Sequence, residues 1–299
     1  MLTAGVGGFR ANFRKLIASG QESRCTDDDR SEKNIRLGGI DTAYLDKGNG
    51  PPLLLLHGFG PGGSALGNWS GVIEPLASSF RVIAPDLLGF GGTGTPEEPD
   101  ELTFDRSARH IADLLRHLAI DRISIIGNNY GGALALKLAV ARPASVSRMV
   151  LLAPPAIEFA IGPHLRQLWS YSASPNNMLK LMRSFVHDPN LISPEAAIQR
   201  HEETQQPGVM AAFSRLFAAP HRLKLRALAT PHRDLAALPH SVLLLHARED
   251  RIVPLGVSIR LSQILQGADL HVFGRCGNLI HAERRDEFLA LAIEFLRND

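Results

Sequence analysis

The segment from residue 123 to 139 constrains the fold of this 299-residue chain more than any other. Its first part, ISII at residues 123–126, predicts a buried strand. Its last part, the alanine- and leucine-rich run at residues 133–139, predicts a helix. The connection between them contains three glycines, at residues 127, 131 and 132. Because glycine lets two backbones approach closely, the segment predicts a sharp strand–turn–helix unit.

Similar strand and helix patterns recur along the chain. A β-hairpin is predicted at residues 34–47, and further strands are predicted at residues 53–56, 81–85, 150–152, 242–245 and 270–273. Helices are predicted at residues 103–118 and 285–297. Strands that alternate with helices are typical of an α/β protein with a mostly parallel, twisted sheet and helices on both faces.

This pattern divides the chain into four parts. Residues 1–33 are predicted to be a loosely ordered N-terminal extension. Residues 34–155 and 221–299 are predicted to form the two halves of one α/β core. Residues 156–220 contain helical runs and no convincing strand, so they are predicted to form a helical lid. Ligands of such sheets bind beyond the carboxyl ends of the strands, which is where this lid would lie.

Composition excludes several other classes of protein. The formal net charge of +2 predicts neither a nucleic-acid partner nor an anionic membrane as partner. No apolar run is long enough to span a bilayer. The two cysteines fit a reducing compartment, so we expect a cytoplasmic location. No cofactor and no metal site are predicted, and a homodimer is the oligomer we expect.

The strand–turn–helix unit has the layout of a nucleophile elbow, G-x-S-x-G, with one exchange. The central position is Asn129 and not serine. A carboxamide does not titrate and is not a nucleophile, so Asn129 cannot form an acyl-enzyme. Asparagine nevertheless tolerates positive φ better than other residues with a Cβ, so we expect the turn to survive.

Four further segments carry a family resemblance. They are HGFGPG at residues 57–62 with NW at 68–69, REDRIVP at 248–254, CGN at 276–278 with Glu283 and DEF at 286–288, and AIQR at 197–200. Together with GNNYGG at residues 127–132, these segments resemble the α/β-hydrolases, and within them the meta-cleavage-product hydrolases, which break carbon–carbon bonds in vinylogous keto acids. The resemblance covers residues 34–296, nearly the whole chain.

The resemblance implies a set of site residues. The serine of the family falls on Asn129, its histidine on Asn278 and its following tryptophan on Leu279, whereas its acid is kept as Asp250. The catalytic set is therefore Asn129, Asn278 and Asp250, with His281 as a substitute base. Backbone N–H groups of Phe59 and Tyr130 would form the oxyanion hole. The substrate-binding residues would be His57, Gly58, Asn68, Asn128, Arg200 and Leu279.

Each of these residues also has a simpler interpretation. Asp250 could merely bind Asn278 or backbone, and His281 could lie on a helix that leads away from the site, which we favour for His281. His57 is expected to support the oxyanion loop. Tyr130 could offer a phenolic proton, although its backbone N–H is the expected contribution. Arg200 could grip a substrate carboxylate or be a solvated surface residue. Asn68 and Asn128 could bind substrate or merely hydrogen-bond one loop to another.

Three functions remain open at this stage. We expect a non-hydrolytic lyase, cyclase, dehydratase or isomerase acting on a small molecule, such as a carboxylate or a polyketide-like keto or enol compound. A catalytically silent ligand-binding protein is the first alternative. A hydrolase in which His281 or a water replaces the missing groups is the second.

Overall fold

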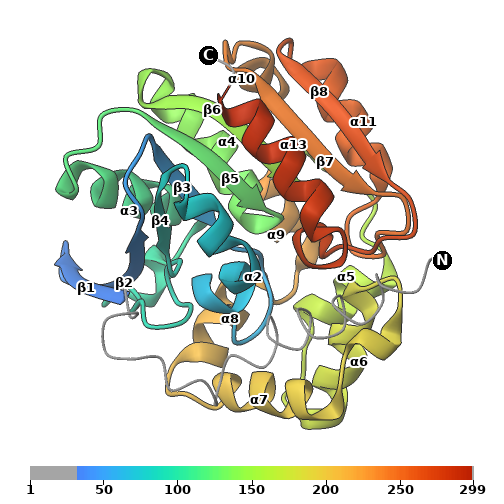
Figure 1. Cartoon of the computed structure of the whole chain (residues 1–299). Coiled ribbons are helices and arrows are strands. Elements are labelled where there is room, and N and C mark those ends of the chain that lie inside the picture. Colours follow the sequence, from blue (N-terminus) through green and yellow to red (C-terminus); the bar gives the residue numbers. More distant parts are fainter. Residues whose placement is uncertain (1–31, 298–299) are drawn as a thin grey trace.

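An eight-stranded sheet runs through the computed structural model, which describes residues 32–297 (Figure 1). The strand order is β1-β2-β4-β3-β5-β6-β7-β8, and β1 and β2 pair antiparallel at one edge. The other strands are parallel to one another. The strands are β1 (Glu32–Leu37), β2 (Ile40–Lys47), β3 (Pro52–Leu56), β4 (Arg81–Pro85), β5 (Ile123–Asn128), β6 (Val146–Leu152), β7 (Val242–Ala247) and β8 (Ala268–Phe273). This confirms the predicted α/β fold class and the hairpin, whereas the predicted N-terminal extension lies almost wholly outside the described residues.

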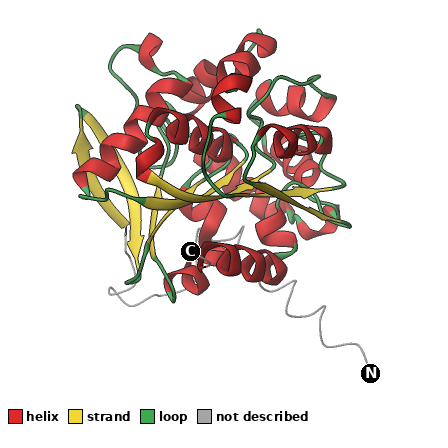
Figure 2. Cartoon of the chain, turned by 90° about the horizontal axis from the view of Figure 1, so that it is seen from above, coloured by secondary structure: helices red, strands yellow, loops and turns green. Residues whose placement is uncertain are grey.

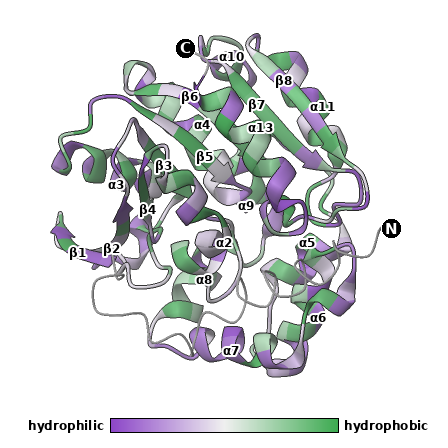
Figure 3. Cartoon of the chain, in the orientation of Figure 1, coloured by the Kyte–Doolittle hydropathy of each residue, from purple (hydrophilic) through white to green (hydrophobic). Residues whose placement is uncertain are grey.

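The central strands are buried on both faces because their sequences are apolar throughout. In β3, Leu54 and Leu56 point to one core cluster, and Leu53 and Leu55 point to the other. Successive side chains of a strand alternate between the two faces of the sheet, so a continuous apolar run is needed where helices cover both. The strong hydrophobic colouring of β5 and β7 shows the same property (Figure 3).

Helices cover the two faces of the sheet (Figure 2). One face packs against α2 (Ala65–Ala77) and α13 (Arg285–Arg297), and the other packs against α3 (Phe104–His117), α4 (Tyr130–Ala141) and α11 (Leu255–Ile264). Thr103 caps α3 by accepting a hydrogen bond from the N–H of Arg106, which explains why this predicted helix begins where it does. The predicted last helix, at residues 285–297, coincides with α13.

A helical insertion connects β6 to β7. It contains α5 (Pro163–Trp169), α6 (Pro175–Phe185), α7 (Pro194–Thr204), α8 (Val209–Phe217), α9 (His221–Leu228) and α10 (His232–Ala236). In Figure 1, α5 to α8 lie beyond the end of the sheet toward which β5, β7 and β8 point. The helices continue past residue 220, so the helical region is longer than the lid predicted at residues 156–220. Within residues 32–297, no helix is both long and apolar enough to cross a bilayer.

Candidate active site

The turn between β5 and α4 has the strained geometry that the sequence predicts for an elbow. Asn129 has φ 47° and ψ −108°, a backbone conformation that residues with a Cβ rarely adopt. A Cβ on Gly131 would lie 2.1 Å from the carbonyl oxygen of Leu56, and a Cβ on Gly127 would lie 2.6 Å from the Cα of Gly132. The glycines are therefore required for the approach of α4 to the sheet, and Asn129 is pushed out at the carboxyl end of β5.

Asn278 meets Asn129 at this end of the sheet. Its Nδ2 donates to Oδ1 of Asn129 at 3.2 Å and to Oδ2 of Asp250 at 2.8 Å. Asn129 follows β5, Asp250 follows β7, and Asn278 follows β8. The carboxyl ends of three parallel strands therefore bring together the three residues that the sequence places there.

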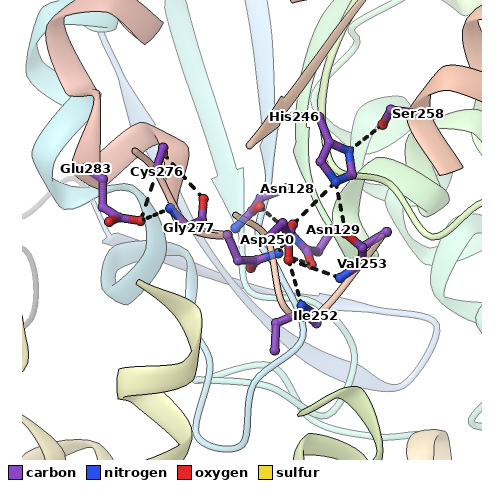
Figure 4. A network of polar contacts seen from close by, with 11 residues as sticks. Asn128, Asn129, His246, Asp250, Ile252, Val253, Ser258, Cys276, Gly277 and Glu283 are labelled. Carbon is purple, nitrogen blue, oxygen red and sulfur yellow. Dashed lines mark hydrogen bonds and ion pairs between the residues drawn. The ribbon is translucent and has the colours of Figure 1, made fainter. Parts of the chain in front are cut away.

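Asp250 is held by donors on all sides. Its Oδ1 accepts the backbone N–H groups of Ile252, at 2.7 Å, and Val253, at 3.1 Å. The side chain is fully buried, and burial raises the pKa of this carboxyl, while nearby His246 and the hydrogen bonds oppose the rise. Figure 4 shows the network around it. Asp250 does not line the cavity, so its direct action is on Asn278.

His246 supports Asp250 from behind, and sequence reasoning missed it. Its Nε2 donates to the carbonyl of Val253 at 2.9 Å and lies 3.7 Å from Oδ2 of Asp250, while its Nδ1 accepts from the hydroxyl of Ser258 at 2.7 Å. Burial lowers the pKa of His246, which keeps the ring neutral. The only signal for this role is that the histidine is the next-to-last residue of an otherwise apolar strand, β7, four residues before Asp250.

A chain of carboxamides crosses the cavity floor from Asn278 to His281. Asn278 donates to Asn129, whose Nδ2 donates to Oδ1 of Asn128 at 2.8 Å. Asn128 donates to Oδ1 of Asn68 at 3.1 Å, and Asn68 lies 2.7 Å from Nε2 of His281. Each amide accepts with its oxygen and donates with its nitrogen, so the chain runs in one direction. We call these four asparagines, with Asp250 and His281, the polar floor.

The end of this chain fixes the chemical state of His281. Because Oδ1 of Asn68 also accepts the N–H of Gly58 at 2.7 Å, the amide nitrogen of Asn68 is the group that faces His281. Nε2 of His281 must then be the acceptor. Burial lowers the pKa of His281 to about 4, so the ring is neutral at pH 7. The expectation that His281 lies on a helix leading away from the site is wrong, since it lines the cavity from α12 (Ile280–Glu283).

The loop after β3 supplies the other wall of the site. His57 has both ring nitrogens engaged, since Nδ1 donates to the carbonyl of Gly58 at 2.9 Å and Nε2 accepts the N–H of Leu87 at 3.0 Å. Burial lowers its pKa to about 4. His57 therefore supports the loop, as expected, and has no nitrogen left for a ligand. The neighbouring N–H of Phe59 donates to no group within residues 32–297.

Tyr130 contributes its backbone and not its ring. As the first residue of α4, its N–H has no acceptor within the helix. Its ring is fully buried against Phe90, Phe104 and Phe217, and burial raises the pKa of its hydroxyl. The side chain does not line the cavity, so a phenolic proton from Tyr130 is not available there.

A cavity of about 230 Å³ lies over the polar floor. All the predicted site residues except Asp250 and Tyr130 line it, including Leu279. Its roof is an apolar face of α6 that sequence reasoning missed, formed by Met178, Leu181, Met182 and Phe185. Their spacing of three, four and seven residues is the signal that could have found it.

Arg200 brings a positive charge to this cavity from α7. Its Nε donates to the carbonyl of Pro61 at 2.9 Å, and no carboxylate within the described residues lies within salt-bridge distance of it. Burial lowers its pKa to about 10, so the guanidinium stays charged at pH 7. Its terminal nitrogens lie over the glycines of the loop that contains Gly60 and Gly63. The interpretation of Arg200 as a solvated surface residue is therefore wrong.

No cluster of metal-ligating side chains is found in the part of the chain that the structure describes. Among residues 32–297, no group of three or more His, Cys, Asp or Glu side chains is arranged to hold a metal ion.

Comparison with known proteins adds evidence independent of this geometry. A family model described as the alpha/beta hydrolase fold matches residues 51–284. The 2-hydroxy-6-oxo-2,4-heptadienoate hydrolase of Pseudomonas putida is 39% identical over 262 residues, which cover 88% of this chain and 95% of that protein. A 2-hydroxymuconate semialdehyde hydrolase from a Pseudomonas species is 38% identical over 266 residues, covering 88% of this chain and 93% of that protein. A solved meta-cleavage product hydrolase of Pseudomonas fluorescens, a mutant complexed with acetates, superposes with a TM-score of 0.86 at 40% identity, covering 88% of this chain and 97% of that one.

These relatives correct the function expected from the sequence. A non-hydrolytic lyase, cyclase, dehydratase or isomerase was expected because Asn129 and Asn278 cannot perform triad chemistry. Relatives that match nearly the whole chain at 38–39% identity are all named as hydrolases. The expectation was wrong because it gave two side chains more weight than a scaffold shared over most of the chain. Because these relatives are named as enzymes, they give no support to the alternative of a catalytically silent ligand-binding protein.

Proposed function

We propose a function from one premise: this chain belongs to the α/β-hydrolase fold family and lies close to the meta-cleavage product hydrolases. It hydrolyses a small carboxylate of the 2-hydroxy-6-oxo-dienoate class, the class named for its relatives. One observation carries this proposal. The contacts of Asn129, Asn278 and Asp250 place an ordered polar floor at the elbow, beneath a cavity of suitable size and charge.

Water is the attacking group in this proposal. Asn129 and Asn278 stand where the family resemblance of the sequence places a serine and a histidine, and neither carboxamide can form or discharge an acyl-enzyme. The Oδ1 atom of Asn278 accepts no hydrogen bond from residues 32–297, and Asn278 lines the cavity. A water that donates to this oxygen would be positioned beside the elbow. Asp250 fixes the amide so that its oxygen, and not its nitrogen, is free for that water.

The remaining groups bind and polarise the substrate. Arg200 pairs with the substrate carboxylate, since its guanidinium lines the cavity and forms no salt bridge within the described residues, while the nearby Glu203 carboxylate partly offsets its charge. The N–H groups of Phe59 and Tyr130 receive the oxygen of the 6-oxo group as negative charge develops there. The helical insertion serves as the lid that keeps bulk water out.

The proton balance closes within the substrate and water. The substrate first tautomerises, its 2-hydroxyl proton moving to C5. Water then adds to the 6-oxo carbon and the C5–C6 bond breaks, leaving its electron pair delocalised in a dienolate. The dienolate oxygen takes up the proton that the water loses. A short carboxylic acid and a shorter hydroxydienoate result. His281, with a pKa of about 4, is a weak base at pH 7, so its part is to hold Asn68 and the carboxamide chain.

The test is turnover of 2-hydroxy-6-oxo-2,4-heptadienoate, followed by loss of the conjugated chromophore and by detection of acetate. We expect wild-type turnover above the uncatalysed rate, and a higher rate in a double variant, Asn129→Ser with Asn278→His, which restores the groups expected in relatives. A wild type without turnover beside an active double variant would refute hydrolysis while leaving the cavity assignment intact. An inactive double variant would refute the cavity assignment as well.

Two further properties stay predictions from the sequence. They are a cytoplasmic location and a homodimer. Light scattering of the purified protein at micromolar concentration would test the dimer, and a mass equal to a single chain would contradict it.

A further inference from the structure

Glu283 joins two segments that lie far apart in the sequence. Its Oε1 accepts the backbone N–H of Gly277 at 2.7 Å, and its Oε2 accepts the backbone N–H of His187 at 2.8 Å. Gly277 immediately precedes Asn278 of the polar floor. His187 follows α6, which forms the cavity roof. Glu283 itself is 4% exposed, on the short helix α12. Figure 4 shows it beside Gly277 and Cys276.

The same two segments also touch each other directly. The N–H of Asn278 donates to the carbonyl of Phe185 at 2.6 Å. A Cβ on Gly277 would lie 2.5 Å from that carbonyl oxygen, so the approach requires glycine. The floor loop at residues 276–279 and the roof segment at residues 185–187 are thus packed backbone to backbone, and the one carboxylate bridges both.

We propose that Glu283 is a positioning residue that makes the floor loop at residues 276–279 and the roof segment at residues 185–187 move as one unit. In the closed unit Asn278 is held against Asn129 while Phe185 is held over the cavity. Displacing the roof then displaces Asn278. The consequence for catalysis rests on the proposed function, whereas the mechanical coupling does not.

A carboxylate is the side chain that this bridge requires. Two backbone N–H groups approach its two oxygens, and only an ionised carboxyl has acceptors on both. The surrounding charged and titratable groups are Asp188, Glu249, Asp250, Arg284 and the thiol of Cys276. Burial, with the carboxylates of Asp250 and Asp188 adding to it, raises the pKa of Glu283 to about 7, so the form with two acceptor oxygens prevails above pH 7. Burying this acid costs free energy of folding. That cost is consistent with a specific positioning role.

Hydrogen exchange of the wild-type protein tests the coupling without any variant. Native-state exchange at increasing urea concentration reports the free energy and the urea dependence of each opening. We expect the amides of His187, Gly277 and Asn278 to share one opening, with the same free energy and the same urea dependence. Different urea dependences for the roof and floor amides would overturn the proposal.

The Glu283→Gln variant provides the second arm. A carboxamide has one acceptor oxygen, so it can serve only one of the two N–H groups, and its own amide group opposes the other. If the segments are coupled, exchange rises about tenfold in both, the size expected for losing a hydrogen bond to a charged group. A rise in only one segment, or in neither, would show that Glu283 has a local role and would overturn the proposal.

Glu294→Gln is the matched control, because Glu294 is exposed on α13 and forms none of the hydrogen bonds that join the two segments. It should leave exchange unchanged in both. A fall of about tenfold in kcat for Glu283→Gln, with 2-hydroxy-6-oxo-2,4-heptadienoate as substrate, would extend the coupling to catalysis. Because the exchange measurements need no turnover, an inactive wild type would count against the proposed function alone.

Discussion

The floor and the roof of the cavity are held together by different kinds of force. The polar floor is a continuous chain of hydrogen bonds from Asp250 to His281, in which every residue has a defined donor or acceptor role. The roof is the apolar face of α6, with Arg200 of α7 as its charged group. Hydrogen bonds are directional and apolar packing is not. On the proposed function, the floor would therefore set the positions of the reacting atoms, and the roof would select which ligand enters.

This difference predicts that substitutions in the floor and in the roof should change different kinetic constants. Changes in the floor should lower kcat or stability, whereas changes in the roof should raise KM. The predictions that follow run from the largest expected effect to the smallest.

Gly131→Ala should be the most damaging single change. Its Cβ would lie 2.1 Å from the carbonyl oxygen of Leu56, and backbone cannot move aside as a flexible side chain can. We expect a loss of about 3 kcal/mol or more in the free energy of unfolding, measured by urea denaturation. Gly256→Ala is the control, because nothing lies within 4 Å of the new Cβ, and its stability should stay the same or rise by up to about 1 kcal/mol. Equal effects at the two sites would contradict the tight elbow.

Asp250→Asn should disturb the hydrogen-bond geometry of the polar floor and so lower kcat. The new amide oxygen can still accept from Ile252 and Val253, but the new amide nitrogen would face the amide nitrogen of Asn278. Asn278 must then rotate, which breaks its contact with Asn129. We expect kcat to fall about 100-fold, with KM changed less than about twofold. Asp269→Asn, at an exposed position on β8, should leave both constants unchanged. A variant in which KM rose while kcat stayed unchanged would show that Asp250 acts on substrate binding.

His281 should make the folded protein sensitive to acid. Its pKa is about 4 in the folded state and near 6.5 when unfolded, so the unfolded state binds more protons between these values. Stability should therefore fall as the pH drops from 6.5 to 4, with His281 contributing up to about 1.4 kcal/mol per pH unit. Urea denaturation of wild type and His281→Gln at pH 7, 6 and 5 measures the difference in slope. Parallel slopes would mean that His281 is not buried in its neutral form.

Arg200→Gln should act on binding from the roof. The charged guanidinium is lost while a polar side chain remains, so KM for a carboxylate substrate should rise about tenfold with little change in kcat. Arg226→Gln on α9, an exposed position, is the control. If kcat fell instead of KM rising, Arg200 would belong with the floor and the division between floor and roof would fail.

The sequence predicted the backbone of the site better than its hydrogen bonds. The strand–turn–helix unit requires glycines at fixed places, so residues 127–132 were enough to locate the elbow. The parallel sheet then placed Asn129, Asp250 and Asn278 together, because all three follow strands.

What sequence reasoning missed depends on side-chain direction and burial. Whether His281 turns into the cavity or away from it depends on a four-residue helix, and no periodicity can be read over so short an element. The support of Asp250 by His246 likewise exists only once β7 and the following loop have folded. The expected non-hydrolytic function was wrong for another reason. It rested on two exchanged side chains, Asn129 and Asn278, and not on the fold shared with relatives that are named as hydrolases.

The central claim is that hydrolysis here proceeds by water at a floor of carboxamides, with no covalent adduct. Intact-protein mass spectrometry during turnover of 2-hydroxy-6-oxo-2,4-heptadienoate tests it most directly. The account predicts that acetate accumulates while the protein mass stays unmodified throughout. An acyl adduct mapped to residue 129, or the absence of acetate formation by the wild type, would contradict it.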